Sequence, residues 1–479
     1  MAMQPRVRRD IQSLIAEGPS GLKVLEDYAA AIAAMKRLDP ADGADPTDPR
    51  SWRFQAAIHG FPGLRPSLDD ARRWGSCRHN SWFFLAWHRI YLFYFESMIQ
   101  SQLGDPTWAL PYWDYTKVDD GSSQVLPEPF RSPTDGNELF TPERDPNVND
   151  ETSPTPLPFE FCDARPALGL GDFSLDGADP AQSFAGGIVQ DSTPNQRARG
   201  SLELTPHGQV HGLVGGDGGL MGAFETAGLD PIFWCHHCNL DRMWEVWIAK
   251  WGADRLPADS AWLDTEFQFF DSTGAVAGKR IRDILETPNL GYVYESTTQP
   301  RDTPGPDPLQ ELAAPPPAPR AAPELLGAAT GIDFSRRTAV DVELAANDRV
   351  AAAVAGDESV APRWFLRVED VAGTAPKAPA YHVYVNLPDG ASGAEHPELR
   401  AGTIASFGIP EASDPAAEHG GVGITDTFEI TDVVATLVAS ADAQFDPRKV
   451  TVHVVPVGLK GELDDGGDVR AGRISVYAG

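Results

Sequence analysis

The run 82–100, WFFLAWHRIYLFYFESMIQ, is apolar on nearly every face, which is typical of a helix in the middle of a bundle. A second run, 230–251, has the same character and reads DPIFWCHHCNLDRMWEVWIAKW. Asp230 is suited to cap this second helix, because Pro231 follows at the first helical position. We therefore predict two buried helices that face one another within a four-helix bundle.

The segments around these two helices predict a mainly α domain over residues 1–297. Residues 7–36 carry apolar side chains at helical spacing, which indicates one or two opening helices. Residues 117–200 are rich in Pro, Gly, Asp and Ser and have little periodicity. We expect this stretch to form long loops wrapped over the bundle.

A change of pattern divides the chain after this helical domain. Residues 298–332 are so dense in proline that they predict an extended tether. Beyond them, short alternating runs such as YHVYVNL (381–387) and KVTVHVVPV (449–457) are separated by Gly, Asp and Pro. This pattern predicts a C-terminal all-β domain over 333–479, built as a sandwich or a barrel.

The charge and the apolar runs limit the classes of partner. The formal net charge is −30, which repels nucleic-acid phosphates and anionic lipid surfaces, so we expect neither as a partner. No apolar run reaches about 18 residues, and the opening MAMQPRVRRDIQSL has charges where a secretory signal needs an apolar stretch. We expect a cytoplasmic protein that does not enter the membrane. Four cysteines do not make a disulfide framework; the redox state of Cys162 and the oligomeric state are left open.

The histidines are concentrated in two parts of the chain. Seven of the eleven fall in two windows, namely His59, His79 and His88, and then His207, His211, His236 and His237. Because His207 and His211 are four residues apart, their rings lie on one face of a helix and can reach a single ion. The fragment PHGQVH has Gln where the zinc-protease pattern needs a catalytic Glu, so that pattern does not apply. His79 is out of phase with His88 on a straight helix, so we place it in the preceding loop.

Six histidines at these spacings predict a pair of metal sites. Imidazole-only sites suit copper, and three neutral ligands leave a position open for an exogenous molecule. Two such ions can exchange two electrons with dioxygen without an organic cofactor. His236 points away from His237 on the helix, so we assign it either to supporting a ligand from behind or to packing. Asp241, one turn after His237, is placed to accept the proton of its non-ligating nitrogen.

These residues resemble the type 3 copper proteins of the tyrosinase and catechol oxidase (polyphenol oxidase) family. The first copper motif of the family resembles HGFPG at 59–63 with CRHNSWFFLAWHR at 77–89. The second, in its plant form, resembles LELTPHGQVHG at 202–212 with DPIFWCHHCNLDRMW at 230–244. The likeness extends through RIRDILETPNLGYVYE (280–295), and more faintly to the β-rich tail, which resembles the plant C-terminal domain. The chain is identified as a bacterial-type member with a plant-like C-terminal domain.

The resemblance implies a ligand set and several further roles. It assigns two copper ions, one held by His59, His79 and His88, the other by His207, His211 and His237. It places Cys77 where fungal relatives form a thioether bond to the second histidine of the first site. It makes Phe224 the gate residue above one copper, and Glu203 the carboxylate that orients a proton-accepting water. Gly208 stands where relatives that hydroxylate monophenols well often have asparagine, which leaves that activity open.

The implied function is oxidation of o-diphenols to o-quinones with reduction of dioxygen to water. The same site accepts an ortho N/O pair, so an o-aminophenol oxidase is the nearest alternative. Dioxygen carriage without turnover, as in the hemocyanins, is an alternative of another class. Carriers repeat such units in arrays, so a lone unit with a Pro-rich tether favours an enzyme. If the β domain covers the copper pocket, cleavage within 298–331 should raise activity.

Overall fold

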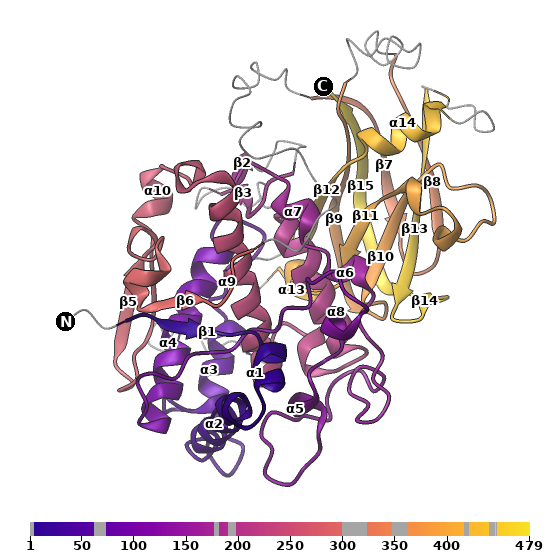
Figure 1. Ribbon diagram of the computed structural model, residues 1–479. Coiled ribbons are helices and arrows are strands. Elements are labelled where there is room, and N and C mark those ends of the chain that lie inside the picture. Colours follow the sequence, from indigo (N-terminus) through magenta and orange to yellow (C-terminus); the bar gives the residue numbers. More distant parts are fainter. Residues whose placement is uncertain are drawn as a thin grey trace. The chain divides into compact units, whose positions relative to one another are not determined.

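The computed structural model describes residues 4–61, 73–176, 182–189, 198–298, 323–346, 362–415, 421–439, 446 and 448–479. The chain divides into two compact units, one formed by residues 1–173 with 210–302 and the other by residues 174–209 with 303–479. The first unit is mainly helical and the second is built on antiparallel sheets, so the predicted fold class is confirmed (Figure 1). No described helix is both long enough and apolar enough to cross a membrane.

The helical unit is organised around two long buried helices. They are α4 (Phe84–Leu103) and α9 (Pro231–Trp251), as the apolar runs predicted. Asp230 caps α9, because its side chain accepts a hydrogen bond from the backbone N–H of Ile232. Arg144 donates two hydrogen bonds to the Asp230 carboxylate, at 2.6 and 2.7 Å, and both side chains are fully buried. Asp230 therefore caps α9 and is itself held in place by Arg144.

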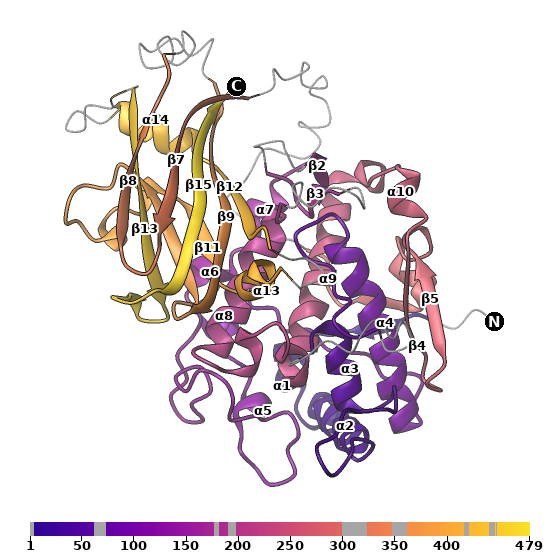
Figure 2. The ribbon, with the colours of Figure 1, turned by 180° about the vertical axis from the view of Figure 1, so that it is seen from behind.

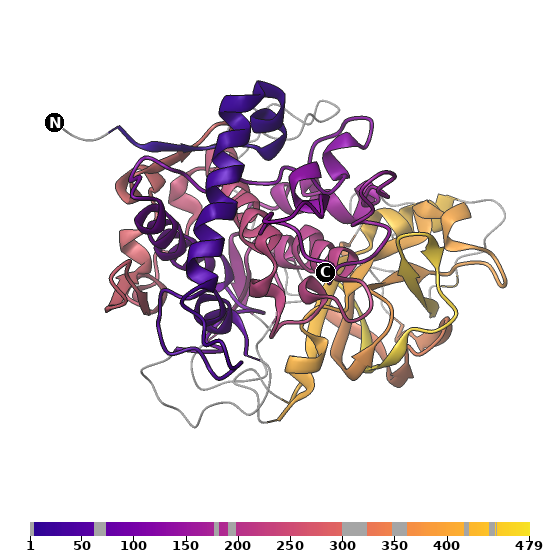
Figure 3. The same cartoon turned by 90° about the horizontal axis from the view of Figure 1, so that it is seen from below.

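Shorter helices and strands surround this pair. The helices at the start of the chain are α1 (Ile11–Glu17), α2 (Pro19–Lys36) and α3 (Trp52–His59); Figure 3 shows the long opening helix, in indigo, along its length. Ser51 caps α3 by accepting a hydrogen bond from the Phe54 backbone N–H. The strands are β1 (Arg6–Arg8), which pairs in parallel with β6 (Tyr292–Tyr294), and the hairpin β4 (Glu266–Phe270) with β5 (Val276–Arg280). The start and the end of the helical unit therefore lie side by side.

The described part of the predicted loop region contains only short elements. They are η1 (Ser122–Gln124), α5 (Glu128–Arg131), α6 (Phe159–Cys162), α7 (Arg165–Leu168), β2 (Ser174–Asp176) and β3 (Gly186–Ile188). The density of Pro and Gly prevents longer helices here, as expected.

The second unit holds two antiparallel sheets, which Figures 1 and 2 show as two layers. The first has the order β11-β10-β13-β14, with β8 also paired to β13, and the second has the order β12-β9-β15-β7. The strands are β7 (Glu324–Asp333), β8 (Thr338–Glu343), β9 (Trp364–Pro376), β10 (Ala380–Val385), β11 (Arg400–Ala405), β12 (Ile424–Glu429), β13 (Lys449–Gly458), β14 (Gly461–Glu462) and β15 (Gly467–Ala478). Two helices, α13 (Ile409–Ser413) and α14 (Thr431–Ala439), accompany them.

The units differ from the predicted boundaries in two places. Strand β7 begins at Glu324, inside the stretch 298–332 that was predicted as tether, and residues 299–322 lie outside the described residues. Its sequence ELLGAATGID has few of the β-branched and aromatic residues that mark strands. Residues 174–200, the last part of the predicted loop region, belong with residues 201–209 to the β-rich unit.

Candidate metal centre

The first histidine group gathers three predicted ligands and one cysteine. His59 is the last residue of α3, His88 lies in α4, and His79 precedes α4 in a loop, as its spacing predicted. Together with Cys77 they offer ligand atoms that all lie within 4.8 Å of one another, and all four side chains are buried. The Cys77 sulfur lies 3.4 Å from Nδ1 of His79 and 3.3 Å from Nε2 of His88. The predicted thioether stays a prediction, with the thiol placed against both rings.

The second group gathers the remaining predicted ligands. His207 lies in a π-helical turn, η3 (Glu203–Gly208), and His211 follows in α8 (Gln209–Gly215). His237 comes from α9, with Nε2 3.3 Å from Nε2 of His211. His236 also belongs to this group by distance, although the sequence assigned it to a supporting or packing role. Its Nδ1 shares a 2.9 Å hydrogen bond with the hydroxyl of Tyr115, so one of its nitrogens is already engaged.

Backbone carbonyls fix four of the six predicted ligand rings. Nδ1 donates to a carbonyl oxygen in His59 (Phe224, 3.0 Å), His88 (Phe84, 2.8 Å), His207 (Glu203, 3.1 Å) and His211 (Met221, 2.9 Å). Because a carbonyl only accepts, Nδ1 must carry the proton, and Nε2 presents its lone pair to the site. This is the arrangement by which proteins orient histidines toward a metal.

Burial keeps the rings of His88, His211 and His236 neutral. Removal from water lowers the pKa of His88 well below its usual value, and the neighbouring His59 lowers it further. Burial likewise lowers the pKa of His211 well below its usual value, and it lowers that of His236 to about 3. A neutral imidazole is the form that binds a metal, so no proton has to be displaced near neutral pH.

The two groups adjoin. The rings of His88 and His237, one from each group, stack with their centroids 4.2 Å apart. The donors of both groups are imidazole nitrogens and one sulfur, which suit copper and do not suit Mg²⁺ or Ca²⁺. The residues therefore fit a pair of neighbouring copper ions, each held by imidazoles from separate segments of the chain.

Comparisons with known proteins agree with this geometry. The family model for the common central domain of tyrosinase matches residues 49–250, and that for the polyphenol oxidase middle domain matches residues 257–306. A model described only as a domain of unknown function matches residues 323–479. The chain is 31% identical over 491 residues to a tyrosinase from Hahella sp. (strain CCB-MM4), an alignment that covers 94% of this chain and 96% of that protein. The chain belongs to the tyrosinase family.

Plant relatives and solved structures extend the comparison of this tyrosinase-family chain. It is 32% identical over 302 residues to a chloroplastic polyphenol oxidase from Malus domestica, covering 57% of this chain and 47% of that protein. A structure of latent apple tyrosinase matches 100% of this chain and 98% of its own at 24% identity, with a TM-score of 0.62. A structure of latent aurone synthase matches 100% of this chain and 90% of its own at 23% identity, with a TM-score of 0.65. These structures support the fold of both units.

The tyrosinase-family assignment makes the protein a copper-dependent phenol oxidase. Its two histidine groups hold the two copper ions of a binuclear centre. Phe224, the predicted gate residue, and Glu203, the predicted proton-accepting carboxylate, lie next to these groups. The Phe224 ring centroid lies 4.6 Å from that of His59 and 5.1 Å from that of His79. Glu203 is 1% exposed, so it is not a surface glutamate, and it begins the turn that carries His207.

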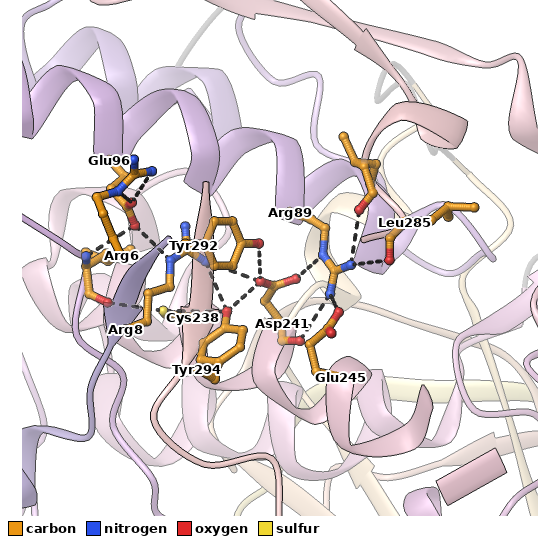
Figure 4. Close-up of polar contacts among 12 residues, drawn as sticks. Arg6, Arg8, Arg89, Glu96, Cys238, Asp241, Glu245, Leu285, Tyr292 and Tyr294 are labelled. Carbon is orange, nitrogen blue, oxygen red and sulfur yellow. Dashed lines mark hydrogen bonds and ion pairs between the residues drawn. The ribbon is translucent and has the colours of Figure 1, made fainter. Parts of the chain in front are cut away.

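Asp241 lies at the centre of a buried ion-pair network (Figure 4). Its carboxylate accepts hydrogen bonds from Arg8, Arg89, Tyr292 and Tyr294. Burial alone would raise the pKa of this carboxyl, but the charges of Arg89 and Arg8 outweigh burial and hold its pKa below the usual value. The predicted contact of Asp241 with His237 stays a prediction. The network instead joins α9 to α4 and β6.

Sequence reasoning missed most members of this network. Arg8 also donates to Glu96 at 2.7 Å, and Arg89 donates to Glu245 at 2.7 Å. One signal was present: Arg89 and Glu96 are charged residues inside an apolar run, and such residues are seldom fully buried unless paired.

The β-rich unit contributes contacts around His207. The ring of Phe407 lies edge-on to the ring of His207, with centroids 5.6 Å apart. A Cβ at Gly208 would approach the Cβ of Ala405 to 2.7 Å, which is closer than real Cβ contacts. Neither neighbour could be identified from the sequence, because Ala405 ends β11 and Phe407 lies in the turn after it, both about 200 residues beyond His207 along the chain.

Proposed function

We propose that this protein oxidises o-diphenols to o-quinones while dioxygen is reduced to water. Two diphenols supply the four electrons and four protons that convert one dioxygen to two waters. The observation that carries the proposal is the stacking of His88 on His237, which makes the two three-histidine groups neighbours. The copper pair, when bound, supplies the exchange of two electrons with dioxygen. The neutral ligand rings favour reduced copper, because they add no negative charge to the site.

The side chains beside the histidines have separate tasks in this proposal. The buried ring of Phe224 forms an apolar wall next to His59 and His79, against which a phenol ring can pack. Glu203 accepts the phenol proton through a water, because it is the acidic residue that begins the turn bearing His207. Gly208 offers no side-chain amide to hold such a water, so diphenol oxidation is proposed as the main reaction and monophenol hydroxylation as a minor one.

Regulation by the β-rich unit is the second part of the proposal. Phe407, a residue of that unit, lies edge-on to the ring of His207. We infer that the Phe407 ring narrows the path by which a phenolic substrate reaches the second copper. Cleavage within 298–331 then raises turnover by letting the Phe407 ring move off His207 while the cleaved fragment stays bound.

Oxygen uptake by the copper-loaded protein with catechol, 2-aminophenol and tyrosine tests the proposed reaction. We expect catechol to be consumed fastest. Faster uptake with 2-aminophenol would assign the enzyme to o-aminophenols instead. Reversible oxygenation without consumption of any substrate would replace the oxidase proposal with dioxygen carriage.

A further inference from the structure

The segment that carries His207 is anchored to the β-rich unit by one buried arginine. The Arg199 guanidinium forms two hydrogen bonds to the Asp426 carboxylate, at 2.8 and 2.6 Å, and the two side chains are 3% and 0% exposed. Arg199 also donates to the backbone carbonyls of Ala405 and Phe407, at 3.3 and 3.4 Å. One side chain therefore binds β12 and the turn after β11 together. A bidentate arginine–carboxylate pair fixes orientation as well as distance.

The chain between Arg199 and His207 has little freedom. Gly200 lies so close to the backbone of Ala185 that an added Cβ would stand 2.3 Å from its carbonyl carbon. The backbone N–H groups of Ser201 and Leu202 donate to the carbonyls of Ser183 and Phe184, at 2.8 and 3.2 Å. A displacement of Arg199 would therefore be transmitted along a fixed backbone to the π-helical turn.

A second anchor follows the ligand. The side-chain amide of Gln209 donates to the Thr403 carbonyl of β11 at 3.2 Å, and Phe407 packs against the His207 ring. Thus Arg199 and Gln209 hold the ligand turn from both ends, and each anchor binds the β11–β12 region. The residues that fix His207 all belong to the same unit as His207 itself.

We propose that Arg199 is a positioning residue for the copper ligand His207. This inference rests on the copper assignment of the proposed function, and not on the substrate or on turnover.

Two variants of the full chain test the proposal by copper retention. Arg199→Gln leaves the buried Asp426 carboxylate without its cation, which also strains the fold. The double variant Arg199→Met with Asp426→Leu removes both charges together, so the fold should tolerate it. In both variants the contacts to the carbonyls of Ala405 and Phe407 are lost. We expect the affinity for the second copper to fall about tenfold or more, as for other residues that orient metal ligands.

The readout is the number of coppers per chain during dialysis against a graded chelator, with circular dichroism to confirm folding. Two controls separate positioning from general destabilisation. Arg363→Gln breaks an exposed ion pair to Glu429 of the same sheet, and Val452→Ala removes buried volume from β13. Both controls should keep two coppers at chelator concentrations that reduce the Arg199 variants to one.

Different results would refute the copper assignment and the positioning role of Arg199. Wild-type protein that never holds two coppers would refute the copper assignment itself. Wild-type protein and both Arg199 variants that hold two coppers with equal chelator resistance would refute the positioning role. Loss of copper from Val452→Ala to the same degree as from the Arg199 variants would also refute it, because the effect would then follow stability alone.

Proteolytic cleavage of the chain provides a second, independent test. A cut within 299–322 leaves the contacts of Arg199 and Gln209 unbroken, since these join residues 199–209 to residues 403–426. We expect the cleaved β-rich fragment to co-elute with the rest of the protein on size exclusion, and its removal by mild denaturant to release one copper. A fragment that dissociates spontaneously and leaves both coppers bound would overturn the proposal.

Discussion

The imidazole rings of His88 and His237 are stacked in parallel, with centroids 4.2 Å apart and planes 7° from parallel. His88 comes from α4 and His237 from α9, so the two buried helices meet at the boundary between the two histidine groups. Each ring fills the space into which the other ring could otherwise rotate. The packing of α4 against α9 therefore fixes how far apart the two histidine groups lie.

Loss of either stacked ring should remove one copper and all turnover. We expect His88→Ala and His237→Ala to fold, because each opens a small cavity in a bundle that holds many other buried side chains. Each variant should bind one copper per chain and take up no oxygen with catechol. Metal analysis and an oxygen electrode measure the two quantities.

A histidine outside the centre supplies the control for this prediction. His396 is partly exposed and pairs with Glu398 in the β-rich unit, so His396→Ala should keep two coppers and full activity. Two coppers with normal oxygen uptake in His88→Ala or His237→Ala would contradict the ligand assignment.

Removal of the Asp241 charge should destabilise the helical unit strongly. Asp241→Asn leaves Arg8 and Arg89 buried without their shared carboxylate, and breaking a buried ion pair in this way costs roughly 3–5 kcal/mol. The comparison is Glu266→Gln, which breaks an exposed pair with Arg280 and should cost no more than about 1 kcal/mol. Urea unfolding of the copper-free proteins measures both values. Equal midpoints for the two variants would show that the network does not stabilise the fold.

The same carboxyl should make stability fall in acid. Because Arg89 and Arg8 hold the pKa of Asp241 below its usual value, the unfolded chain takes up its proton first as the pH falls. The stabilisation is therefore complete above the unfolded pKa, about 3.9, and is lost as the pH falls through the lower folded value. We expect the wild-type protein to lose more stability than Asp241→Asn below about pH 4. Parallel acid limbs in urea titrations at several pH values would contradict this assignment.

The sequence predicted those parts of the centre that depend on local spacing. Apolar runs identified α4 and α9, and the phase of the helix placed His79 in the loop before His88. The resemblance to a known family supplied the pairing of ligands across the chain. Periodicity alone could not supply it, because helical spacing carries no information about which distant segment a helix faces.

The parts that escaped prediction depend on long-range contacts. The three-residue strands β1 and β6 are too short for an alternating pattern to reveal, so the partners of Asp241 were not found. The Pro- and Gly-rich composition of 174–209 indicates loops but not the unit to which they belong. Arg199 and Asp426 are separated by most of the β-rich unit in sequence, and nothing local marks either as a buried partner.

Phe407 should limit the rate with small phenols. Removing an aromatic contact worth about 0.5–1.5 kcal/mol should raise kcat/KM for catechol roughly 2- to 10-fold in Phe407→Ala. Phe334→Ala is a suitable control, because Phe334 is buried beside Tyr381 elsewhere in the same unit. An unchanged kcat/KM in Phe407→Ala with two coppers bound would remove Phe407 as the obstacle.

An asparagine side chain at position 208 should fit only if Ala405 is replaced by glycine at the same time. In Gly208→Asn the new Cβ would stand 2.7 Å from the Cβ of Ala405. This overlap should cost roughly 1–3 kcal/mol, because a methyl group on a strand cannot rotate away. Ala405→Gly removes that methyl group. We therefore expect Gly208→Asn alone to be less stable than wild type, and the double variant to recover most of the loss.

The two variants also test the proposed role of Gly208 in the reaction. If an amide beside His207 helps Glu203 to hold a water, the double variant should gain oxygen uptake with tyrosine while its rate with catechol changes little. The ratio of the two rates is the informative quantity, because a change in copper content alters both rates alike. A stable double variant with two coppers and the wild-type ratio would show that the residue after His207 does not control monophenol hydroxylation in this protein.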